Sequence, residues 1–414
     1  MSSSTARQGA VLFRLLSDGG RWKEVLSGAA KGFVFAPRLF EAQQPAMKFS
    51  IIARFMNGTN GAGTGEALEM ILRACNRRLT AVERTVSSPL SADSANFGQS
   101  VDADDVSKRD ESVAILMCSY NGERFLSEQL ISIEQQTHAQ WRLFVSDDGS
   151  TDSTLDILES FRARMGEQKV TLLSGPRTGF ADNFMSVTCL ESVSADFCAW
   201  SDQDDVWAAD KLSAALTWLR QVPVGVPALY ASRTTVINES GIEVGMTPGY
   251  CHSFSFANAL VQNVAAGNTM VFNRAALELL RAGPAQGIVA HDWWAYLLVT
   301  GAGGQFYFDQ VPHLFYRQHE SNSIGANAGL MAALTRIRKM FEGRLRRWID
   351  QNIRHLDAVE HLLTESNREI LRQFKDARSQ GLAGRIKGLW RSGIYRQTLF
   401  GNLGLAIAIV FKGI

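Results

Sequence analysis

The stretch VAILMCSYNGERFLSEQLISIEQQTHAQWRLFVSDDGS, residues 113–150, decides the fold. It contains an apolar β-prone run at 113–118, then a segment of helical length, then a second apolar run at 142–146. A crossover of that length joins parallel strands, because it must carry the chain back over the sheet. The stretch therefore predicts a β-α-β unit.

The same alternation continues downstream. Apolar runs at 170–174 and 197–200 predict two more strands, and the segments 150–165 and 181–193 are long enough for crossover helices. Further strands are expected within 228–238, 268–273, 305–308 and 313–319, and a further helix at 291–303. We therefore expect an α/β fold with a Rossmann-like, mixed but mostly parallel sheet.

Both ends of the chain differ from this α/β domain, which we place at 111–325. Residues 1–110 show weak periodicity and include a stretch rich in Ser, Ala and Asp, so we expect an N-terminal extension with a partly disordered linker. Residues 326–414 are expected to form a helical C-terminal region, which from 327 onward holds 16 Lys and Arg against 7 Asp and Glu. A solvated helical face and contact with a membrane surface both fit such a region.

Composition excludes several classes of protein. A formal net charge of +1 over 414 residues argues against a chain that binds nucleic acid along its whole length. Five widely spaced cysteines without a CxxC pair suggest neither a disulfide framework nor a zinc site, and reduced thiols fit the cytoplasm. No apolar stretch approaches the roughly 18 residues of a membrane span, and the N-terminus lacks an export signal.

Polar residues follow three of the four strands of the first half of the domain. Ser119, Tyr120 and Asn121 follow the first strand, DDGS with Asp148 follows the second, and SDQDD at 201–205 follows the fourth. Ligands of open α/β sheets bind beyond the carboxyl ends of the strands. A single such cluster is explained as well by a turn, but three together indicate a binding site.

The SDQDD cluster has the composition of a metal site. Three carboxylates within four residues repel one another unless a positive charge lies among them, and Mg²⁺ or Mn²⁺ prefers such oxygen ligands. In an extended segment Asp202 and Asp204 point the same way, so both can approach one ion. The alternative is a solvated acidic turn, or a helix N-cap at Asp205.

Other candidate groups lie further along the chain. Asp292, beside two tryptophans at the start of the helix, is a candidate general base, although an N-terminal carboxylate stabilised by the helix dipole fits as well. Arg317 and His319 are suited to a diphosphate or to a metal already held by carboxylates. Arg177 and Asn183 could line a donor pocket or belong to a loop that leads into a helix.

The combination of VAILMCSYNGERFLSEQLISIEQQT, LFVSDDGSTDST, SDQDDVWAADKL, HDWWAYLLV and FYRQH, in this order, resembles inverting family 2 glycosyltransferases of GT-A fold. The resemblance covers about residues 111–325 and is greatest to bacterial rhamnosyltransferases of O-antigen and surface-polysaccharide assembly. It implies that 111–325 is the catalytic domain.

The resemblance also implies roles for the candidate residues. Tyr120, Asn121 and Asp148 would hold the donor's nucleoside. The further candidates for the donor site are Ser119, Arg177, Asn183, Asp202 and Arg317. Asp202 and Asp204 would match the family's DxD pair, which bridges a metal to the donor diphosphate, and His319 is a further candidate ligand. Asp292 would be the base that deprotonates the acceptor. His291 stands where an acidic residue is common, and the QxxRW signature of processive synthases is missing, so one-sugar transfer is implied.

The function expected from these features is transfer of one sugar, L-rhamnose as the best match, from a dTDP- or UDP-sugar to a glycan or lipid-linked acceptor. The enzyme would be cytoplasmic, with peripheral contact at the inner membrane face through its C-terminal region. Two alternatives stay open: a nucleotidyltransferase that makes an activated sugar, although SYNGERF is a poor phosphate loop, and a non-catalytic protein that binds nucleotide sugars.

Overall fold

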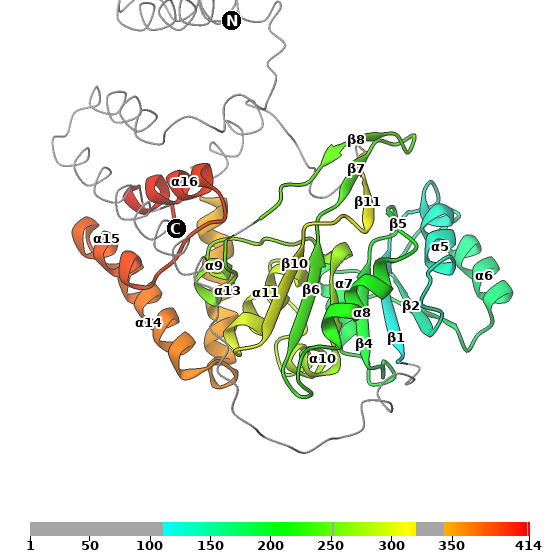
Figure 1. The fold of residues 1–414 in the computed structure, drawn as a ribbon, viewed down its shortest axis with the longest axis horizontal. Helices are drawn as coiled ribbons and strands as arrows, with labels where there is room; N and C mark the ends of the chain where they lie inside the picture. Colours follow the sequence, from blue (N-terminus) through cyan, green and yellow to red (C-terminus); the bar gives the residue numbers. More distant parts are fainter. Residues whose placement is uncertain (1–110, 251, 320–342, 412) are drawn as a thin grey trace, which may run out of the picture. The chain divides into compact units, whose positions relative to one another are not determined.

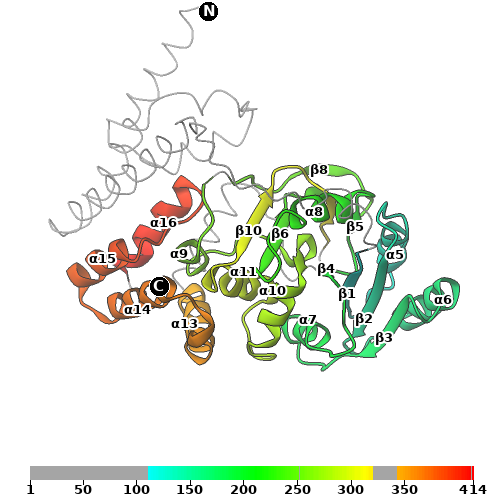
Figure 2. The ribbon, with the colours of Figure 1, turned by 60° about the horizontal axis from the view of Figure 1, so that its bottom comes forward.

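A computed structural model describes residues 111–250, 252–319, 343–411 and 413–414, and all of them belong to one compact unit of the chain. The predicted N-terminal extension and the predicted boundary near residue 325 lie outside the described residues. Figures 1 and 2 show the arrangement of the elements from two directions.

The main sheet has seven strands in the order β10-β6-β9-β4-β1-β2-β3. Strands β1 to β4, with the helices between them, confirm the predicted β-α-β alternation, and β1 pairs in parallel with both β2 and β4. Their bounds are β1 Val113–Ser119, α5 Leu126–Glu134, β2 Trp141–Asp147, α6 Thr154–Met165, β3 Val170–Ser174, α7 Phe180–Thr188 and β4 Phe197–Ser201. The order places the carboxyl ends of β1 and β4 side by side.

The second half of the domain makes the sheet mixed. Strand β9 is antiparallel to both of its neighbours, β4 and β6, whereas β10 is parallel to β6. The bounds are α8 Lys211–Leu219, β6 Ala228–Ser232, α9 Phe256–Ala259, η2 Gly267–Thr269, β9 Val271–Asn273, α10 Arg274–Arg281, α11 His291–Gly301 and β10 Gln305–Asp309. Only the last three residues of the segment predicted as a strand at 268–273 belong to a strand, because a 3-10 turn occupies 267–269.

A second, four-stranded sheet crosses the carboxyl end of the first in the order β5-β11-β7-β8. Its strands are β5 Val206–Trp207, β7 Thr235–Ile237, β8 Glu243–Met246 and β11 Leu314–Arg317. The predicted strand at 228–238 is in fact two strands, since the chain leaves the main sheet after β6 and enters the second sheet as β7. This crossing brings the residues that follow β11 near those that follow β4.

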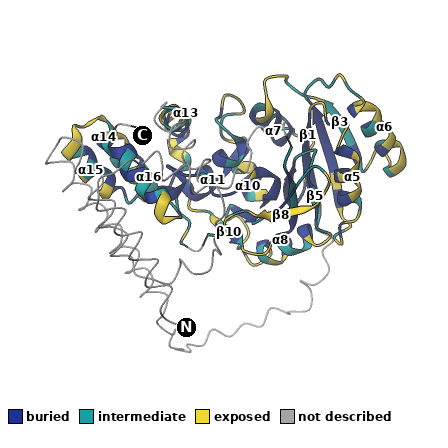
Figure 3. Ribbon diagram, turned by 90° about the horizontal axis from the view of Figure 1, so that it is seen from above, coloured by how far each residue is buried: buried dark blue, intermediate teal, exposed yellow. Residues whose placement is uncertain are grey.

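Alternation along β1 explains how both faces of the main sheet are covered. Ala114, Leu116 and Cys118 belong to one apolar core, whereas Val113, Ile115 and Met117 belong to another, as a period of two requires. Helices α7, α10 and α11 contribute to the first core, and α5, α6 and α8 to the second. Figure 3 shows the strands buried between these helices. The candidate site therefore lies at the end of a rigid, doubly covered sheet.

The C-terminal region is helical, as expected. It comprises α13 Arg344–Ala358, η3 Glu360–Leu362, α14 Glu365–Ser379, α15 Leu382–Arg391 and α16 Leu399–Val410. Apolar side chains of these helices share a core with α11, and Asn367 donates to the carbonyls of Thr300 and Gly301 at the end of α11. Within the described residues, no helix is both long and apolar enough to cross a membrane.

Candidate active site

The acidic cluster lies directly after β4. Carboxylate oxygens of Asp202, Asp204 and Asp205 all lie within 4.8 Å of one another, and Asp202 and Asp204 are half-buried whereas Asp205 is buried. Burial is the main cause that raises the pKa of Asp202 to about 7, and repulsion from Asp204 and then Asp292 adds to it. Such a set of oxygens fits one hard divalent cation, which would lower the cost of ionising all three.

Asp205 has a different environment from the other two carboxylates. It accepts a hydrogen bond of 2.5 Å from the Asn268 side-chain amide and one of 3.2 Å from the backbone N–H of Arg317. Burial, followed by Asp204 and Asp202, raises its pKa well above the usual value. Asp205 thus joins the end of β4 to η2 and β11 and caps no helix, while Asp202 and Asp204 are left nearer to solvent.

Strand β11 delivers Arg317 and His319 to this cluster. The imidazole Nε2 of His319 lies 2.8 Å from a carboxylate oxygen of Asp204. Arg317 is fully buried and donates from Nε to the Asp204 carbonyl at 3.1 Å, from Nη1 to the Glu239 carbonyl at 3.0 Å and from Nη2 to the Glu128 carboxylate at 2.5 Å. His319 is thus placed to bind the same ion as Asp204, whereas these donors of Arg317 hold three segments of the protein together.

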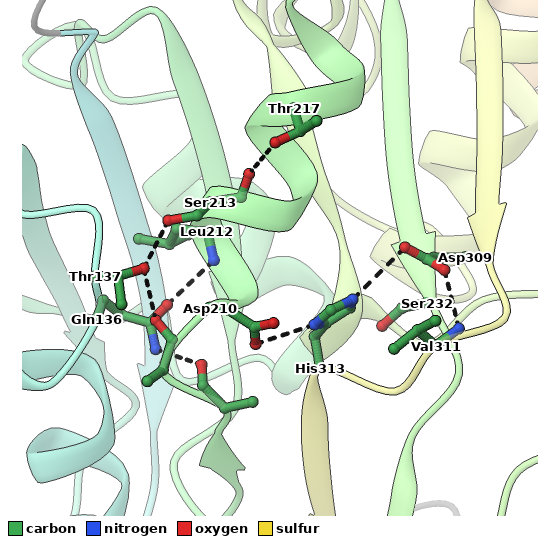
Figure 4. A network of polar contacts seen from close by, with 12 residues as sticks. Gln136, Thr137, Asp210, Leu212, Ser213, Thr217, Ser232, Asp309, Val311 and His313 are labelled. Carbon is green, nitrogen blue, oxygen red and sulfur yellow. Dashed lines mark hydrogen bonds and ion pairs between the residues drawn. The ribbon is translucent and has the colours of Figure 1, made fainter.

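Figure 4 shows the polar network at the opposite end of β11. The His313 ring lies 3.1 Å from the Asp210 carboxylate through Nδ1 and 3.6 Å from the Asp309 carboxylate through Nε2. The Asp309 carboxylate also accepts a 2.9 Å hydrogen bond from the Tyr230 hydroxyl. The start of β11 is therefore fixed to α8, β6 and β10, which sets the direction in which its other end approaches the acidic cluster.

Lys211, which the sequence did not single out, lies buried near the acidic cluster. Its ammonium nitrogen is 3.3 Å from the centroid of the Trp207 ring and has no hydrogen-bond partner in the part of the chain that the structure describes. Burial lowers the pKa of Lys211 well below its usual value, and attraction to Asp205 and Asp202 opposes this shift. Lys211 is the first residue of α8, and nothing in the sequence marks a lysine at that position as buried.

The residues after β1 and β2 form a second part of the candidate site, beside the acidic cluster. Ser119 is buried and donates to the Asp147 carboxylate at 2.9 Å, while the neighbouring Tyr120 is 58% exposed. Asn121 has a positive φ of 48°, and its side chain accepts a 2.9 Å hydrogen bond from the Thr151 N–H. The loops after the two strands are thus tied together, with the Tyr120 ring projecting from them.

Gln203, another residue the sequence did not single out, ties the loop after β1 to the acidic cluster. Its side-chain amide accepts from the Tyr120 N–H and donates to the Tyr120 carbonyl, both at 2.9 Å. A Cβ atom added to Gly122 would lie 2.3 Å from the Gln203 side-chain oxygen, so this close approach requires glycine. The middle residue of DQD therefore acts on the backbone and leaves the two flanking aspartates for a ligand.

Asp148, Arg177 and Asn183 lie together beyond β2 and β3. The Asp148 carboxylate accepts a 2.6 Å hydrogen bond from the backbone N–H of Arg177, whose φ of 60° is unusual for a side-chain-bearing residue. Asn183 is buried and exchanges two hydrogen bonds with Ser146, at 2.5 and 3.0 Å. The glycine-containing loop is thus held against the end of β2, with Asn183 beneath it.

Asp292 lies in the first turn of α11 and faces the acidic cluster. Its carboxylate accepts a 2.6 Å hydrogen bond from the Trp293 N–H. Burial is the main cause that raises the pKa of Asp292 to about 6, and hydrogen bonds to the carboxylate oppose this rise. Asp292 lies near enough to Asp202 for its charge to add to the rise in the pKa of Asp202. A carboxylate with a pKa near 6 is mostly ionised at neutral pH and is still basic enough to accept a proton.

His291 points in another direction, into the apolar core. Its ring stacks on Phe184 with centroids 4.0 Å apart and meets the edge of Trp200 at 4.7 Å. Burial lowers its pKa to about 3, and neither ring nitrogen has a hydrogen-bond partner within the described residues. His291 is therefore a neutral core side chain, and Asp292 is the member of the pair that faces the site.

A mixed sheet of this topology, with an acidic cluster after its fourth strand, has the architecture of a GT-A glycosyltransferase. The model of the family "Glycosyl transferase family 2" matches residues 114–277. The dTDP-rhamnosyl transferase RfbG of Shigella flexneri is 30% identical over 230 residues, which cover 53% of this chain and 78% of that protein. The chain therefore belongs to glycosyl transferase family 2, and of the three classes left open by the sequence it is the glycosyltransferase.

Other similarities are shorter or more distant. The glucosyltransferase WfgD of Escherichia coli, named as acting on α-D-GlcNAc-diphosphoundecaprenol, is 34% identical over 108 residues, or 26% of this chain and 40% of that protein. Among solved structures, the mannosyltransferase PcManGT of Pyrobaculum calidifontis, in complex with GDP-Man and Mn²⁺, is 16% identical with a TM-score of 0.43 and covers 88% of this chain and 98% of that one.

Proposed function

We propose that this glycosyltransferase moves one L-rhamnose from a dTDP-activated donor to a glycan or lipid-linked acceptor, with inversion at the anomeric carbon. The observation that carries the proposal is the pair of half-buried carboxylates, Asp202 and Asp204, in a cluster near enough to Asp292 for its charge to affect Asp202. Asp202 and Asp204 suit a metal ion bound to the donor diphosphate, and Asp292 offers a base to the acceptor hydroxyl.

In this proposal Asp202, Asp204 and His319 hold a divalent cation, Mg²⁺ or Mn²⁺. The 2.8 Å approach of His319 to Asp204 supports their acting on one ion. The ion would neutralise the charge of the departing nucleotide diphosphate. Buried Lys211 lies near the carboxylates, and its attraction opposes the rise that burial causes in the pKa of Asp202. Buried Arg317 holds the backbone of the cluster through the Asp204 carbonyl.

The donor's nucleoside would lie over the loops after β1 and β2. The exposed Tyr120 ring offers a surface for a base, and Asn121 and Asp148 shape the backbone beneath it. Ser119 and Asn183 support those loops from below, and the Arg177 guanidinium lies against Gly149. The donor site is thus proposed from residues of both loops rather than from one motif.

Asp292 would take the proton of the acceptor hydroxyl as that oxygen attacks the anomeric carbon. The new bond forms on the face opposite the departing diphosphate, so the configuration inverts. Its position at the start of α11, with its carboxylate held by the Trp293 N–H, keeps the base fixed relative to the acidic cluster. A general base of this kind contributes roughly 10²- to 10⁴-fold in rate.

The choice of rhamnose rests on the similarity to RfbG, which is named a dTDP-rhamnosyl transferase, and the choice of a lipid-linked acceptor on the similarity to WfgD. A cytoplasmic enzyme in peripheral contact with the inner membrane face would reach both the nucleotide sugar and a membrane-held acceptor. The basic C-terminal region is the part of the chain that we assign to this contact.

Release of nucleotide diphosphate from a panel of nucleotide sugars, with Mn²⁺ or Mg²⁺ and with chelator, tests the proposal. We expect turnover to be greatest with dTDP-L-rhamnose, to stop on chelation, and to be nearly lost in Asp204→Ala and Asp292→Asn. Asp156→Asn, on the exposed side of α6, is the matched control and should retain full activity. Faster turnover of a UDP-sugar would refute the choice of donor, and full activity in chelator would refute the metal.

A further inference from the structure

The last two helices, α15 and α16, carry apolar side chains on their outer surface. They are consecutive and lie beside each other in both views (Figures 1 and 2). Large apolar residues that are substantially exposed recur on them, namely Leu382 38%, Trp390 53%, Leu399 46%, Phe400 82% and Phe411 60%. Single exposed apolar residues are ordinary, but five within 30 residues of sequence form a group that needs a reason.

These side chains follow the periodicity of a helix face. On α15, the exposed Leu382 and Trp390 are eight residues apart on one side of the helix, and Ile386 between them is half-buried and packs against the core at the edge of this stripe. On α16, Leu399, Leu403, Ile407 and Phe411 have the same spacing, with half-buried residues between two exposed ends. Residues four apart lie on one side of a helix, so each helix carries an outer apolar stripe besides the face that packs on the core.

The buried face of α15 is separate from this stripe. Arg385, Leu389 and Ser392 are buried, and the Arg385 guanidinium donates to the carbonyl of Val410 near the end of α16. Lys387 and Arg391, both exposed, lie on the other side of the apolar stripe at helical spacing. Around α15 the order is therefore a buried face, an apolar stripe and then a cationic edge.

The charge of this segment has one sign. Residues 381–414 contain five Lys and Arg and no Asp or Glu. A second copy of the chain would bring these cations against one another, whereas an anionic lipid surface attracts them and accepts the apolar stripe at the same time. Tryptophan and phenylalanine at the boundary, with Lys and Arg beside them, are the composition of helices that lie in a membrane interface.

We infer that α15 and α16 form a docking surface for an anionic bilayer, with the two apolar stripes inserted among the lipid headgroups and Lys387 and Arg391 at the phosphates. The inference deepens the proposed function, on which it rests for the reason why a bilayer should be reached. The surface lies on the C-terminal helices and uses none of the residues assigned to the metal, the donor or the base.

Co-sedimentation of the full chain with vesicles tests the inference. We expect binding to vesicles of phosphatidylcholine mixed with phosphatidylglycerol and little binding to phosphatidylcholine alone. Each cation near an anionic surface is worth roughly fivefold in binding, so loss of two cations alone weakens binding about 25-fold. The double variant Lys387→Glu with Arg391→Glu also adds two negative charges and should therefore bind at least about 25-fold more weakly. Leu399→Ser with Phe400→Ser should lose about tenfold or more, because the inserted apolar area is lost.

Matched controls carry the same changes elsewhere on the surface. Arg354→Glu with Arg368→Glu changes the net charge equally on α13 and α14, and Ile242→Ser with Val244→Ser removes exposed apolar residues at β8. Both should bind vesicles within about twofold of the original chain. Circular dichroism and thermal melting of every variant establish that the chain is folded.

Three results would overturn the inference: no binding of the original chain to anionic vesicles, equal binding by the α15 and α16 variants, or equal losses in the controls. A dimer in solution that disappears in Leu399→Ser with Phe400→Ser, without vesicle binding, would assign the surface to a second copy instead. Release of nucleotide diphosphate without vesicles is measured in parallel, so turnover without vesicle binding refutes the docking surface alone. Vesicle binding without turnover on any donor refutes the proposed function and leaves the docking surface standing.

Discussion

The pH dependence of turnover gives a direct test of Asp292 as the base. Burial raises the pKa of this carboxyl to about 6, so the ionised form that can accept a proton is lost as the pH falls through that value. About nine-tenths of the enzyme is then competent at pH 7 but only about one-tenth at pH 5. We therefore expect kcat/KM to fall about tenfold between these two pH values at saturating metal.

Substitution separates this effect from titration of the metal ligands. Asp292→Asn should lower kcat by roughly 10²- to 10⁴-fold, because the amide cannot accept the proton. It should also remove the acidic limb of the pH–rate profile, which is the fall in rate below about pH 6. Asp202, whose pKa is raised to about 7, titrates in the same range, but a bound cation favours its ionised form, so a limb due to Asp202 would move with metal concentration.

The assay is the initial rate of nucleotide diphosphate release with acceptor present, measured from about pH 5 to pH 8 at two saturating metal concentrations. Asp156→Asn serves as the control and should keep both the plateau and the limb. A limb of unchanged position and depth in Asp292→Asn would refute the assignment. So would a rate for the original enzyme that stays flat from pH 5 to pH 7.

Other predictions concern the scaffold of the site. Burial lowers the pKa of His291 to about 3, so between about pH 6.5 and pH 3 the histidine is protonated in the unfolded chain but not in the folded one. The free energy of unfolding should therefore fall by about 1.4 kcal/mol for each pH unit as the pH drops through this range. Urea unfolding should show this slope reduced in His291→Phe, and equal slopes would contradict it. Arg317→Met should lower the free energy of unfolding by about 2–4 kcal/mol, because it leaves buried carbonyls unpaired. Glu128→Gln should lower it by less than about 1 kcal/mol, because the Glu128 side chain is 58% exposed. Similar losses for the two variants in urea unfolding would refute this reasoning. Gly267→Ala places a Cβ atom 2.3 Å from the His291 ring and should lower the free energy of unfolding by about 1–3 kcal/mol. The loss should be smaller when His291 is also replaced by Ala. Strict additivity of the two substitutions in this double-mutant cycle would exclude the clash.

Much of the catalytic half of the fold could be read from local pattern. Strands β1 to β4 begin and end within two residues of the predicted runs, because a buried parallel strand is a continuous apolar run whose length is visible in the sequence. The second sheet was not visible in this way. The run at 228–238 divides between two sheets, and β5 and β8 are too short or too exposed to show a period.

Within the site, the sequence by itself determined which groups are chemically able to act. Three acidic residues after a strand predict a cation, and an aspartate at the start of an apolar helix predicts a titratable group in a partly dry place. Local spacing also separated Asp202 and Asp204 from Asp205, and in the structure Asp205 has hydrogen-bond partners of its own, Asn268 and Arg317.

Only the tertiary structure decided which of these groups meet and what surrounds them. Gln203 bonds the backbone of Tyr120, 83 residues away, and Asn268 bonds Asp205, 63 residues away, and no local period in the sequence marks either contact. The orientation of the His291–Asp292 pair was likewise fixed by the aromatic rings of Phe184 and Trp200, which take up the histidine and leave the aspartate facing the site. Residue type and local period record what a side chain can do, but burial and neighbours, which set its charge and direction, come from contacts between distant segments.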